Sequence, residues 1–531
     1  MTAEAQYEVV VVGAGPAGMM AASLLGKYGC KVLVLEAEPT LIDYPRAVGL
    51  DDESLRAFQA AGVVGNLLEH TVPHQLLAFV DHKHRDLARL LPPASLFGWP
   101  RRNGFIQPLA DRVLYEGLEA FENVTVQFDS RVTELTQDDE KVTVHYEEHG
   151  TPKTVTTQFA IGADGGKSPT RKSLGTSFEG STAKEHWLVV DIRHDPIGRP
   201  GAWVIADRHR PYVNIGLPHG VRRFEFMLFK GETEQDVEHP EFIEKLVAPI
   251  VPKGTKLDII RKRVYSHNSR IAGDFRKGRI FLAGDAAHLM SVWQGQGYNS
   301  GIRDSMNLAW KIAAVLKGQA SMKMLDTYNG ERRDHAKAMI NLSATVGKMV
   351  SLTNPLATGF RDVFFRSIGI FPKIKRYILE MRFKPMPKIS NGAVTFYGTD
   401  TEDTPVGKLF MQPTVATLDS PSIKLDDAIG PWFAVLAWNN DPSEILDEEA
   451  LELLKSVGAN LVCLRPLVQL HWNKDAAPDH IVGDIDGSLQ RWFNDRPESV
   501  LLLRPDRIVG GASQAYAASE MVKRFFKVLQ Q

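Results

Sequence analysis

Residues 9–36 read VVVVGAGPAGMMAASLLGKYGCKVLVLE, and this stretch decides the fold. A β-branched run typical of a buried parallel strand leads into G-x-G-x-x-G, a helical sequence follows, and a second apolar run ends at Glu36. Strand, glycine loop, helix, strand and acid together form the fingerprint of a dinucleotide-binding βαβ unit. A G-x-G-x-x-G by itself is often only a turn, so the flanking strands and the acid are what favour binding here.

The three glycines of this loop have different physical roles. Gly13 allows the tight turn after the strand, Gly15 lets the backbone approach a pyrophosphate, and Gly18 lets the helix pack closely on the strand. The helix N-terminus offers unpaired N–H groups to the anion, and Glu36 can accept a hydrogen bond from a ribose hydroxyl. The residues expected at this part of the site are Gly13, Gly15, Pro16, Ala17, Gly18, Glu36 and Ala37.

The composition bounds the class of protein. The 531 residues suffice for two or three domains, and 62 basic against 64 acidic residues leave a net charge of −2, which favours neither nucleic acid nor an anionic membrane as a partner. Only two cysteines occur, Cys30 and Cys463, which argues for a reducing cytoplasm and against a disulfide framework or a zinc site. The uncharged stretch 9–26 contains four glycines and a proline and follows two glutamates, so we expect neither a signal peptide nor a membrane span.

Two later strand-to-loop junctions also present glycine and aspartate. A buried strand at 158–163 leads into Asp164-Gly165, and another at 279–283 leads into Gly284-Asp285. Because ligands of α/β sheets bind beyond the carboxyl ends of the strands, these carboxylates could hydrogen-bond ribose or ribityl hydroxyls. The alternative is that each aspartate is only a helix cap or turn residue. Before the first of these junctions, antiparallel strands are expected at 124–128, 132–135 and 142–146. After the second, helix is expected at 301–316 and onward to about 383.

The fingerprint, Asp164-Gly165 and Gly284-Asp285, in this order and spacing, resemble the three signatures of class A flavoprotein aromatic hydroxylases, whose type member is para-hydroxybenzoate hydroxylase. The resemblance covers residues 1 to about 380. More narrowly, the chain is similar to the 3-(3-hydroxyphenyl)propionate hydroxylases of bacterial phenylpropanoid degradation, in residues 41–47, 97–108, 222–227 and 292–301. One departure is Ser291, where the family usually has proline, and it bears on the rigidity of the following loop.

The resemblance implies a fold in three parts. Residues 1–385 would form an α/β FAD-binding domain, a Rossmann-like βαβ arrangement of the GR2 type, with a β-sheet substrate domain inserted near 75–100 and 180–270. A linker rich in proline and glycine would span 386–394. Residues 395–531 resemble a thioredoxin-like C-terminal α/β domain; without Cys-x-x-Cys it would do no thiol redox chemistry, and packing or oligomerisation is the expected role. Whether the chain forms a homodimer is left open.

The resemblance also implies the cofactor and its contacts. FAD would bind non-covalently, with Arg46 and Gln107 beside the flavin and Val132 at the adenine end. The loop from Gly295 to Asn299 would bring backbone N–H groups to the pyrimidine edge of the ring, where negative charge gathers on reduction. The further FAD contacts implied are Asp164, Gly165, Gly284, Asp285, Gly295, Gly297, Tyr298 and Asn299.

The reaction implied is the ortho-hydroxylation of a phenolic acid. An FAD-dependent monooxygenase would convert 3-(3-hydroxyphenyl)propionate, and 3-hydroxycinnamate, to the 2,3-dihydroxy catechol, with NADH or NADPH and O2 as co-substrates. No second G-x-G-x-x-G exists for the nicotinamide, which favours transient docking. The alternatives are hydroxylation of another phenol or a polyketide-like aromatic, a flavin oxidase or dehydrogenase, and a non-catalytic flavin-binding protein.

The substrate contacts are the least determined part. Arg210 and Tyr212 match an arginine–tyrosine pair that lies between flavin and substrate in para-hydroxybenzoate hydroxylase; the alternative is an edge cation and an ordinary core tyrosine. A propionate needs a cation, and the sequence does not choose among its candidates. His219 is proposed as the acceptor of the phenol proton, and Trp293 is a further candidate catalytic residue. The candidate cations are Arg101, Arg102 and Arg223.

Overall fold

Strand β1 (Val9–Val12) lies inside a six-stranded sheet, as its run of valines predicts. It pairs in parallel with β2 (Val32–Leu35) on one side and with β12 (Phe159–Gly162) on the other. The sheet order is β18-β19-β12-β1-β2-β8, with β18 (Arg276–Lys277), β19 (Ile280–Leu282) and β8 (Val124–Gln127). This computed structural model describes residues 7–44, 46–92, 96–368, 370–386, 388–396, 404–472 and 480–531.

One expected strand has a different partner. Residues 124–128 were expected among antiparallel strands, but β8 pairs in parallel with β2 and is the edge strand of the six-stranded sheet. Helix α4 (Gln107–Gly117) precedes β8, so the segment is a crossover connection of the βαβ kind. The antiparallel strands are instead β9 (Ser130–Gln137), β10 (Val142–Glu148) and β11 (Thr151–Thr157), which form a separate three-stranded sheet.

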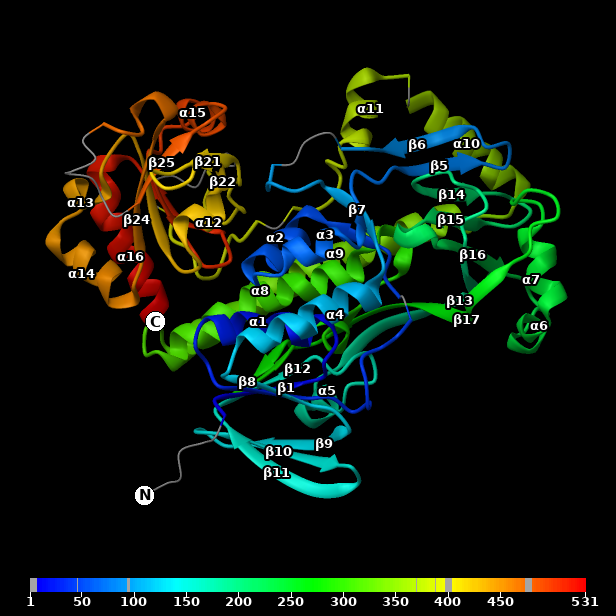
Figure 1. Ribbon diagram of the computed structural model, residues 1–531, viewed down its shortest axis with the longest axis horizontal. Coiled ribbons are helices and arrows are strands. Elements are labelled where there is room, and N and C mark those ends of the chain that lie inside the picture. Colours follow the sequence, from blue (N-terminus) through cyan, green and yellow to red (C-terminus); the bar gives the residue numbers. More distant parts are fainter. Residues whose placement is uncertain are drawn as a thin grey trace.

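Helices cover one face of the six-stranded sheet. Helices α1 (Pro16–Lys27), α4 and α8 (Gln296–Leu316) lie on one side of it, and the sheet β11-β10-β9 lies on the other (Figure 1). The Cβ of an alanine at Gly301 would lie 3.2 Å from the Cα of Gly284 and 3.4 Å from the Cβ of Ala17, so small residues let α1 and α8 approach the sheet. The other helices of this region are α2 (Asp52–Ala60), α3 (Val64–Leu68), α5 (Pro169–Leu174), α9 (Thr327–Val350), α10 (Pro355–Ile368) and α11 (Pro372–Leu379).

An eight-stranded sheet lies beside this layer. Its order is β20-β17-β13-β16-β15-β14-β5-β6, and its strands come from the two segments expected as an insertion and from a short strand at 288–289. One face packs on α6 (Glu234–Glu238) and α7 (Pro240–Val247), and the opposite face turns toward the helices. The strands are β5 (Leu77–Asp81), β6 (Asp86–Leu90), β13 (Phe178–Arg193), β14 (Ala202–Ala206), β15 (Tyr212–Gly216), β16 (Arg222–Leu228), β17 (Asp258–Ala272) and β20 (His288–Leu289). A further three-stranded sheet has the strand order β3-β7-β4, with β3 (Gly49–Asp51), β7 (Arg102–Phe105) and β4 (Thr71–Val72).

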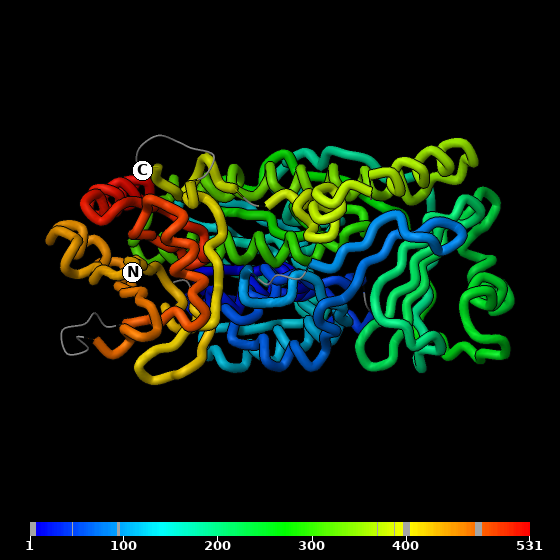
Figure 2. The backbone as a smooth tube through the Cα atoms, turned by 90° about the horizontal axis from the view of Figure 1, so that it is seen from above, coloured from blue at the N-terminus to red at the C-terminus, as the bar shows by residue number. Residues whose placement is uncertain are grey.

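The C-terminal residues form a seven-stranded sheet of their own. Its order is β22-β21-β25-β24-β23-β26-β27, with β23 to β25 parallel. Figure 2 shows these residues, orange to red, at one end of an elongated molecule and the strands of the eight-stranded sheet at the other. The elements are β21 (Thr414–Ala416), β22 (Ile423–Lys424), α12 (Leu425–Ile429), β23 (Ala434–Trp438), α13 (Pro442–Ile445), α14 (Glu448–Val457), β24 (Asn460–Pro466), β25 (His480–Asp484), α15 (Ser488–Asn494), β26 (Val500–Leu503), β27 (Val509–Ser513) and α16 (Ala518–Gln530).

The stretch expected as a linker is packed. Ile389 and Val394 are buried in the core of the C-terminal sheet, and the Thr395 amide donates to the Gly510 carbonyl at 2.7 Å. A second core is continuous across the boundary, because Trp432 and Phe433 belong to the same buried cluster as Trp310 of α8. None of the described helices is both long enough and apolar enough to cross a membrane.

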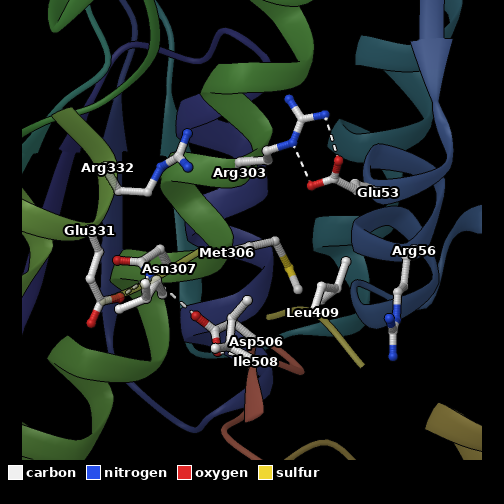
Figure 3. A pocket seen from close by; sticks show the side chains of 11 residues that line it. Glu53, Arg56, Arg303, Met306, Asn307, Glu331, Arg332, Leu409, Asp506 and Ile508 are labelled. Atoms are coloured by element: carbon white, nitrogen blue, oxygen red, sulfur yellow. Dashed lines mark hydrogen bonds and ion pairs between the residues drawn. The ribbon is translucent and has the colours of Figure 1, made fainter. Parts of the chain in front are cut away.

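A buried ion-pair network fastens the C-terminal sheet to α8 and α9. Arg504 donates to both carboxylate oxygens of Glu331 on α9, at 3.0 and 2.8 Å, and also to Asp506. Lys311 on α8 lies 2.9 Å from Glu331, and Asn307 donates to both acids. Figure 3 shows Asn307, Glu331 and Asp506 facing one another beside a small crevice. Each buried acid of this network therefore has a cationic partner, and the contact between the C-terminal sheet and the two helices is buried and specific.

We expect Arg504→Ala to destabilise the protein by about 3–5 kcal/mol, because it leaves two buried carboxylates without their shared cation. The measurement is urea unfolding of the full chain. The control is Arg524→Ala on α16, whose ion pair with Glu520 is about half exposed and should change stability by less than about 1 kcal/mol. Equal effects of the two substitutions would contradict a structural role for the network.

Candidate functional site

A cavity of about 580 Å³ lies where the ends of three parallel strands face the eight-stranded sheet. Strands β1, β12 and β19 are neighbours in one parallel register, so their glycine and aspartate junctions meet at one edge of the six-stranded sheet, as the sequence predicts. Of the cofactor residues predicted from the sequence, the cavity is lined by Gly13, Gly15, Pro16, Ala17, Glu36, Ala37, Arg46, Gln107, Val132, Asp164, Gly165, Gly284, Asp285, Gly295, Gly297 and Tyr298.

The fingerprint glycines occupy the positions that their roles require. Gly13 has φ +102°, and a Cβ there would lie 2.6 Å from the Ala163 carbonyl oxygen. Gly18 does not line the cavity, since a Cβ on it would lie 2.0 Å from the Gly13 carbonyl oxygen, and its role is close helix–strand packing. A Cβ on Gly15 would meet nothing within 4 Å, so the backbone here borders open space at the N-terminus of α1.

The acids at the strand ends differ in how they are held. Glu36 accepts from the Ala14 amide at 2.7 Å, which ties the end of β2 to the glycine loop. One oxygen of Asp164 accepts from the Thr170 amide at 2.9 Å, as a turn residue would, while its Oδ1 is buried without a partner in the described protein. Burial raises the pKa of Asp285, which also lines the cavity.

Asp304 fixes the third junction, and the sequence analysis missed it. Its carboxylate on α8 accepts from the Gly284 amide at 3.0 Å, pairs with the His288 ring at 2.7 Å, and accepts from Arg332 at 2.8 Å. Burial would raise the pKa of Asp304, but its interactions with His288 and Arg332 bring it down to about 2. The signal in the sequence was a carboxylate on the face of α8 formed by Gly301, Ser305 and Leu308.

The loop before α8 borders the cavity with backbone. Gly295 has φ +62° and is the N-cap of the helix, and a Cβ on Gly297 would meet nothing within 4 Å. Asn299 lies behind this loop: its amide donates to the Gly295 carbonyl at 2.6 Å and its oxygen accepts from Ser54 at 2.7 Å. Asn299 therefore braces the loop and does not line the cavity. Ser291, the departure from the family pattern, donates to Ser343 of α9 at 3.0 Å.

Asp111 is a second residue that the sequence did not single out. It accepts from Gln107 at 3.0 Å and from the Tyr298 hydroxyl at 3.2 Å, and Gln107 in turn accepts from the Ala47 amide at 2.9 Å. Burial raises the pKa of Asp111 to about 7, although both hydrogen bonds oppose the rise. The acid thus orients two side chains that line the cavity.

These features fit a flavin dinucleotide. Glycines without side-chain neighbours at two places allow close approach of a pyrophosphate and of a flat ring. The buried, unpartnered Oδ1 of Asp164 and the carboxylate of Asp285 are acceptors for polyol hydroxyls.

Comparison with known proteins agrees with this geometry. A family model described as an FAD binding domain matches residues 6–343, and one described as the HcaD C-terminal domain matches 407–528. The 3-(3-hydroxy-phenyl)propionate/3-hydroxycinnamic acid hydroxylase of Mycolicibacterium smegmatis is 50% identical over 530 residues, covering 100% of this chain and 94% of the relative. The chain belongs to the FAD-dependent aromatic hydroxylases. The protein of the same description from Paraburkholderia xenovorans is 44% identical over 97% of this chain and 90% of its own length.

Solved structures share the fold of this hydroxylase. The flavin-dependent monooxygenase PieE, in complex with FAD and substrate, is 20% identical with a TM-score of 0.82, and the match covers 99% of both chains. The p-nitrophenol 4-monooxygenase PnpA from Pseudomonas putida is 26% identical with a TM-score of 0.65, over 71% of this chain and 98% of that one. FAD is therefore the cofactor of this hydroxylase, and its activity is that of a monooxygenase.

The eight-stranded sheet closes the hydroxylase cavity with one face of its strands. Val213 and Ile215 of β15 line the cavity, as do Ala202 and Val204 of β14. Tyr212 points to the opposite face, where its ring stacks on Phe226 at 5.8 Å. The prediction that Tyr212 faces the substrate is wrong, because side chains alternate along a strand and it is the odd-numbered residues of β15 that line the cavity.

Arg210 and His219 are also remote from the cavity. Arg210 is bound to Glu232 through two hydrogen bonds of 2.8 and 2.6 Å, so it is neither a solvated cation nor a flavin contact. His219 is exposed and lies 2.9 Å from His70, ring nitrogen to ring nitrogen. The predicted catalytic roles of both residues are corrected, since neither lines the cavity.

The three candidate cations differ in whether the described residues supply them with a partner. Arg223 is held by both oxygens of Asp191, at 2.7 and 2.9 Å, and Arg101 donates to the Glu380 carbonyl at 2.8 Å. Arg102 on β7 lines the cavity, its Nε is buried without a partner, and no described carboxylate forms an ion pair with it. Burial lowers the pKa of Arg102 to about 10. Arg102 is the cation that an incoming anion could compensate.

Arg102 also borders a second, apolar pocket of about 250 Å³. The two cavities share Arg102, Leu77, Trp293 and Gln294, so they adjoin at this point. Trp293 lines both and packs edge-to-face on Trp187 at 4.8 Å. An aromatic ring with an acidic side chain matches an apolar wall beside a cation that has no carboxylate partner among the described residues.

We expect Asp285→Ala to lower the affinity of the hydroxylase for FAD about ten- to a hundredfold while the chain still folds, because a hydrogen bond to a buried acceptor is lost. The measurements are the FAD retained on purification and the titration of the FAD-free protein with FAD, with folding checked by circular dichroism. Asp139→Ala, at an exposed turn, is the control. If Asp285→Ala binds FAD with unchanged affinity, Asp285 serves only as a turn residue.

We expect Asp111→Asn to stabilise the holoenzyme more at pH 8 than at pH 5. The folded pKa of about 7 exceeds the unfolded value of about 3.9, so protonation contributes stability below about pH 4 that is lost as pH rises through 7. Asparagine cannot ionise and avoids this loss, which amounts to at most about 4 kcal/mol. Thermal unfolding across this pH range measures it, and a constant difference at all pH values would contradict the raised pKa.

Proposed function

We propose that this hydroxylase converts 3-(3-hydroxyphenyl)propionate, and 3-hydroxycinnamate, to the 2,3-dihydroxy product with NADH or NADPH and O2. The names of relatives about half identical over the whole chain support this substrate class. The observation that carries it to this chain is Arg102, a buried guanidinium without a carboxylate partner among the described residues, at the junction of the cavity and an apolar pocket.

Physical chemistry favours a carboxylate beside Arg102. A buried cation without a counter-ion is costly, and an anion that arrives with the substrate compensates it. The planar guanidinium can bind both oxygens of a carboxylate, which fixes orientation as well as position. The propionate would lie at Arg102, and the ring would extend along the apolar wall formed by Leu77, Val213 and Ile215.

We propose that the FAD contacts are those residues predicted from the sequence that line the cavity, with Gly18 and Asn299 as supports. When bound, FAD accepts reducing equivalents from NAD(P)H and activates O2 for electrophilic transfer to the ring. The protein orients the ring through the loop at 295–297, excludes water with the sheet face and Trp293, and holds the substrate acid at Arg102. We propose that the nicotinamide docks transiently, since the sequence has only one glycine fingerprint, G-x-G-x-x-G.

We further propose domain boundaries at 1–385 and 395–531 and a thioredoxin-like C-terminal part. Parallel β25, β24 and β23 flanked by antiparallel β26 and β27, with α16 packed on β27, support that arrangement. Two buried cysteines that are not paired in a disulfide support a cytoplasmic location.

The proposed function is tested with purified holoenzyme. 3-(3-Hydroxyphenyl)propionate should stimulate NAD(P)H oxidation, and the product should be the 2,3-dihydroxy acid with one oxygen atom from O2. Substrate-stimulated NAD(P)H oxidation without oxygen incorporation would indicate an oxidase instead. No stimulation by any hydroxyphenylpropanoid would overturn the substrate assignment.

We expect Arg102→Ala to raise the KM for 3-(3-hydroxyphenyl)propionate about ten- to a hundredfold, because a charge-assisted hydrogen-bonded pair is lost. The amide of the same acid carries no charge, and its KM should be nearly unchanged by the substitution. Arg101→Ala is the matched control, since the neighbouring arginine does not line the cavity. A similar rise in KM for acid and amide would mean that Arg102 acts only through packing.

A further inference from the structure

Glu225 is a buried carboxylate in the cavity that the mechanism above leaves without a role. It lies in the middle of β16, is 6% exposed, and lines the cavity. Glu36, Asp164 and Asp285 line it at the ends of the parallel strands, on the dinucleotide side. Within the described chain, Glu225 is the one carboxylate that the eight-stranded sheet presents to the cavity, among the valine and isoleucine side chains of its wall.

Tyr265 and Arg223 position this carboxylate. The Tyr265 hydroxyl on β17 donates to Glu225 Oε2 at 2.9 Å. Arg223 Nη1 lies 3.8 Å from Oε1, too far for a hydrogen bond, and the same guanidinium is held by Asp191. Oε1 therefore retains the capacity to accept a proton or hydrogen bond from a ligand.

The surroundings of Glu225 set its basicity. The charged and titratable groups that face it in the described residues are Arg223 on its own strand, Asp191 on β13 and Tyr265 on β17; β15 presents Val213. Burial raises the pKa of Glu225, while Arg223 and the Tyr265 hydrogen bond oppose the rise. A carboxylate with a raised pKa is a better acceptor near neutral pH than an exposed one.

We infer that Glu225 is the catalytic residue that accepts the phenolic proton of the substrate, with Tyr265 as its positioning residue. The inference rests on the proposed function. In this step the O–H bond of the phenol breaks, the proton bonds to a carboxylate oxygen of Glu225, and the electron pair stays on the phenolate oxygen. The phenolate enriches the ring in electrons, which electrophilic oxygen transfer to the adjacent carbon requires. No electrons leave the substrate in this step.

The other titratable groups nearby do not fit this role. His219 is remote from the cavity, as described above. His267 packs between Trp187 and Trp293, does not line the cavity, and has a pKa lowered by burial to about 4. The Tyr265 pKa is raised well above its usual value by burial and by Glu225, so its hydroxyl stays protonated and acts as a donor.

The first experiment measures ionisation of the bound phenol. Oxidised holoenzyme is saturated with 3-(3-hydroxyphenyl)propionate without NAD(P)H, and phenolate absorbance is followed across pH. In wild type, once Glu225 is ionised, part of the bound phenol should transfer its proton to Glu225 and absorb as phenolate at a pH where the free phenol is still protonated. Glu225→Gln should remove this phenolate absorbance at neutral pH and slow single-turnover hydroxylation about a hundredfold. Glu232→Gln, in the loop after β16 and outside the cavity lining, is the matched control.

The second experiment uses Tyr265→Phe, which keeps the carboxylate but removes its donor. Because the hydrogen bond favours the ionised form, its loss should raise the pKa of Glu225 and shift the acidic limb of the single-turnover rate to higher pH, with the maximal rate retained. A role in folding alone would lower the rate equally at all pH values and would count against the assignment. If Glu225→Gln fails to retain FAD, the pH profile of Tyr265→Phe still tests the assignment of Glu225.

The outcomes separate the inference from the proposed function. If wild type does not hydroxylate 3-(3-hydroxyphenyl)propionate, the proposed function falls, and the assignment of Glu225 falls with it. If wild type does so and Glu225→Gln ionises the bound phenol and turns over as wild type does, only the assignment of Glu225 is overturned.

Discussion

The parallel pairing of β1, β12 and β19 is the constraint on which the site depends. Parallel strands end at the same edge of a sheet, so this pairing brings residues near 13, 164 and 285 together although they are far apart in sequence. Gly13, Gly18 and Gly284 carry no side chain where the strand ends and α1 meet, so these elements approach closely. Asp304 then locks the third junction to α8 and α9 by hydrogen bonds. The strand ends that line the cavity are thus held in place by hydrogen bonds.

The alternation of side chains along β15 and β16 determines what the cavity offers to a substrate. With Val213 and Ile215 turned inward, Tyr212 must face the other side of the sheet, where it packs on Phe226. In β16 the same alternation turns Glu225 inward and Phe226 outward. A shift of one residue would exchange these two sets entirely. The wall is therefore apolar with a single carboxylate.

Several buried arginines of the described residues are paired with carboxylates, and Arg102 is not. Arg504, Arg223 and Arg332 each meet a carboxylate within hydrogen-bond distance. Arg102 differs, because burial acts on it without a described carboxylate to offset the cost. A folded protein tolerates such a cation where a ligand supplies the anion. This contrast is the reason for proposing Arg102 as the residue that binds the substrate acid.

The sequence by itself determined the features that depend on local order along the chain. Residues 9–36 specify a strand, a glycine turn, a helix and an acid, and these contacts form between near neighbours. The strand at 124–127 was assigned to the wrong sheet, because pairing partners are chosen by tertiary packing. Only the tertiary structure chose Arg102 among three arginines and placed Glu225, Asp111 and Asp304 at the site. The reason is physical: burial, pairing and strand facing depend on residues distant in sequence, whereas turns and strand propensity do not.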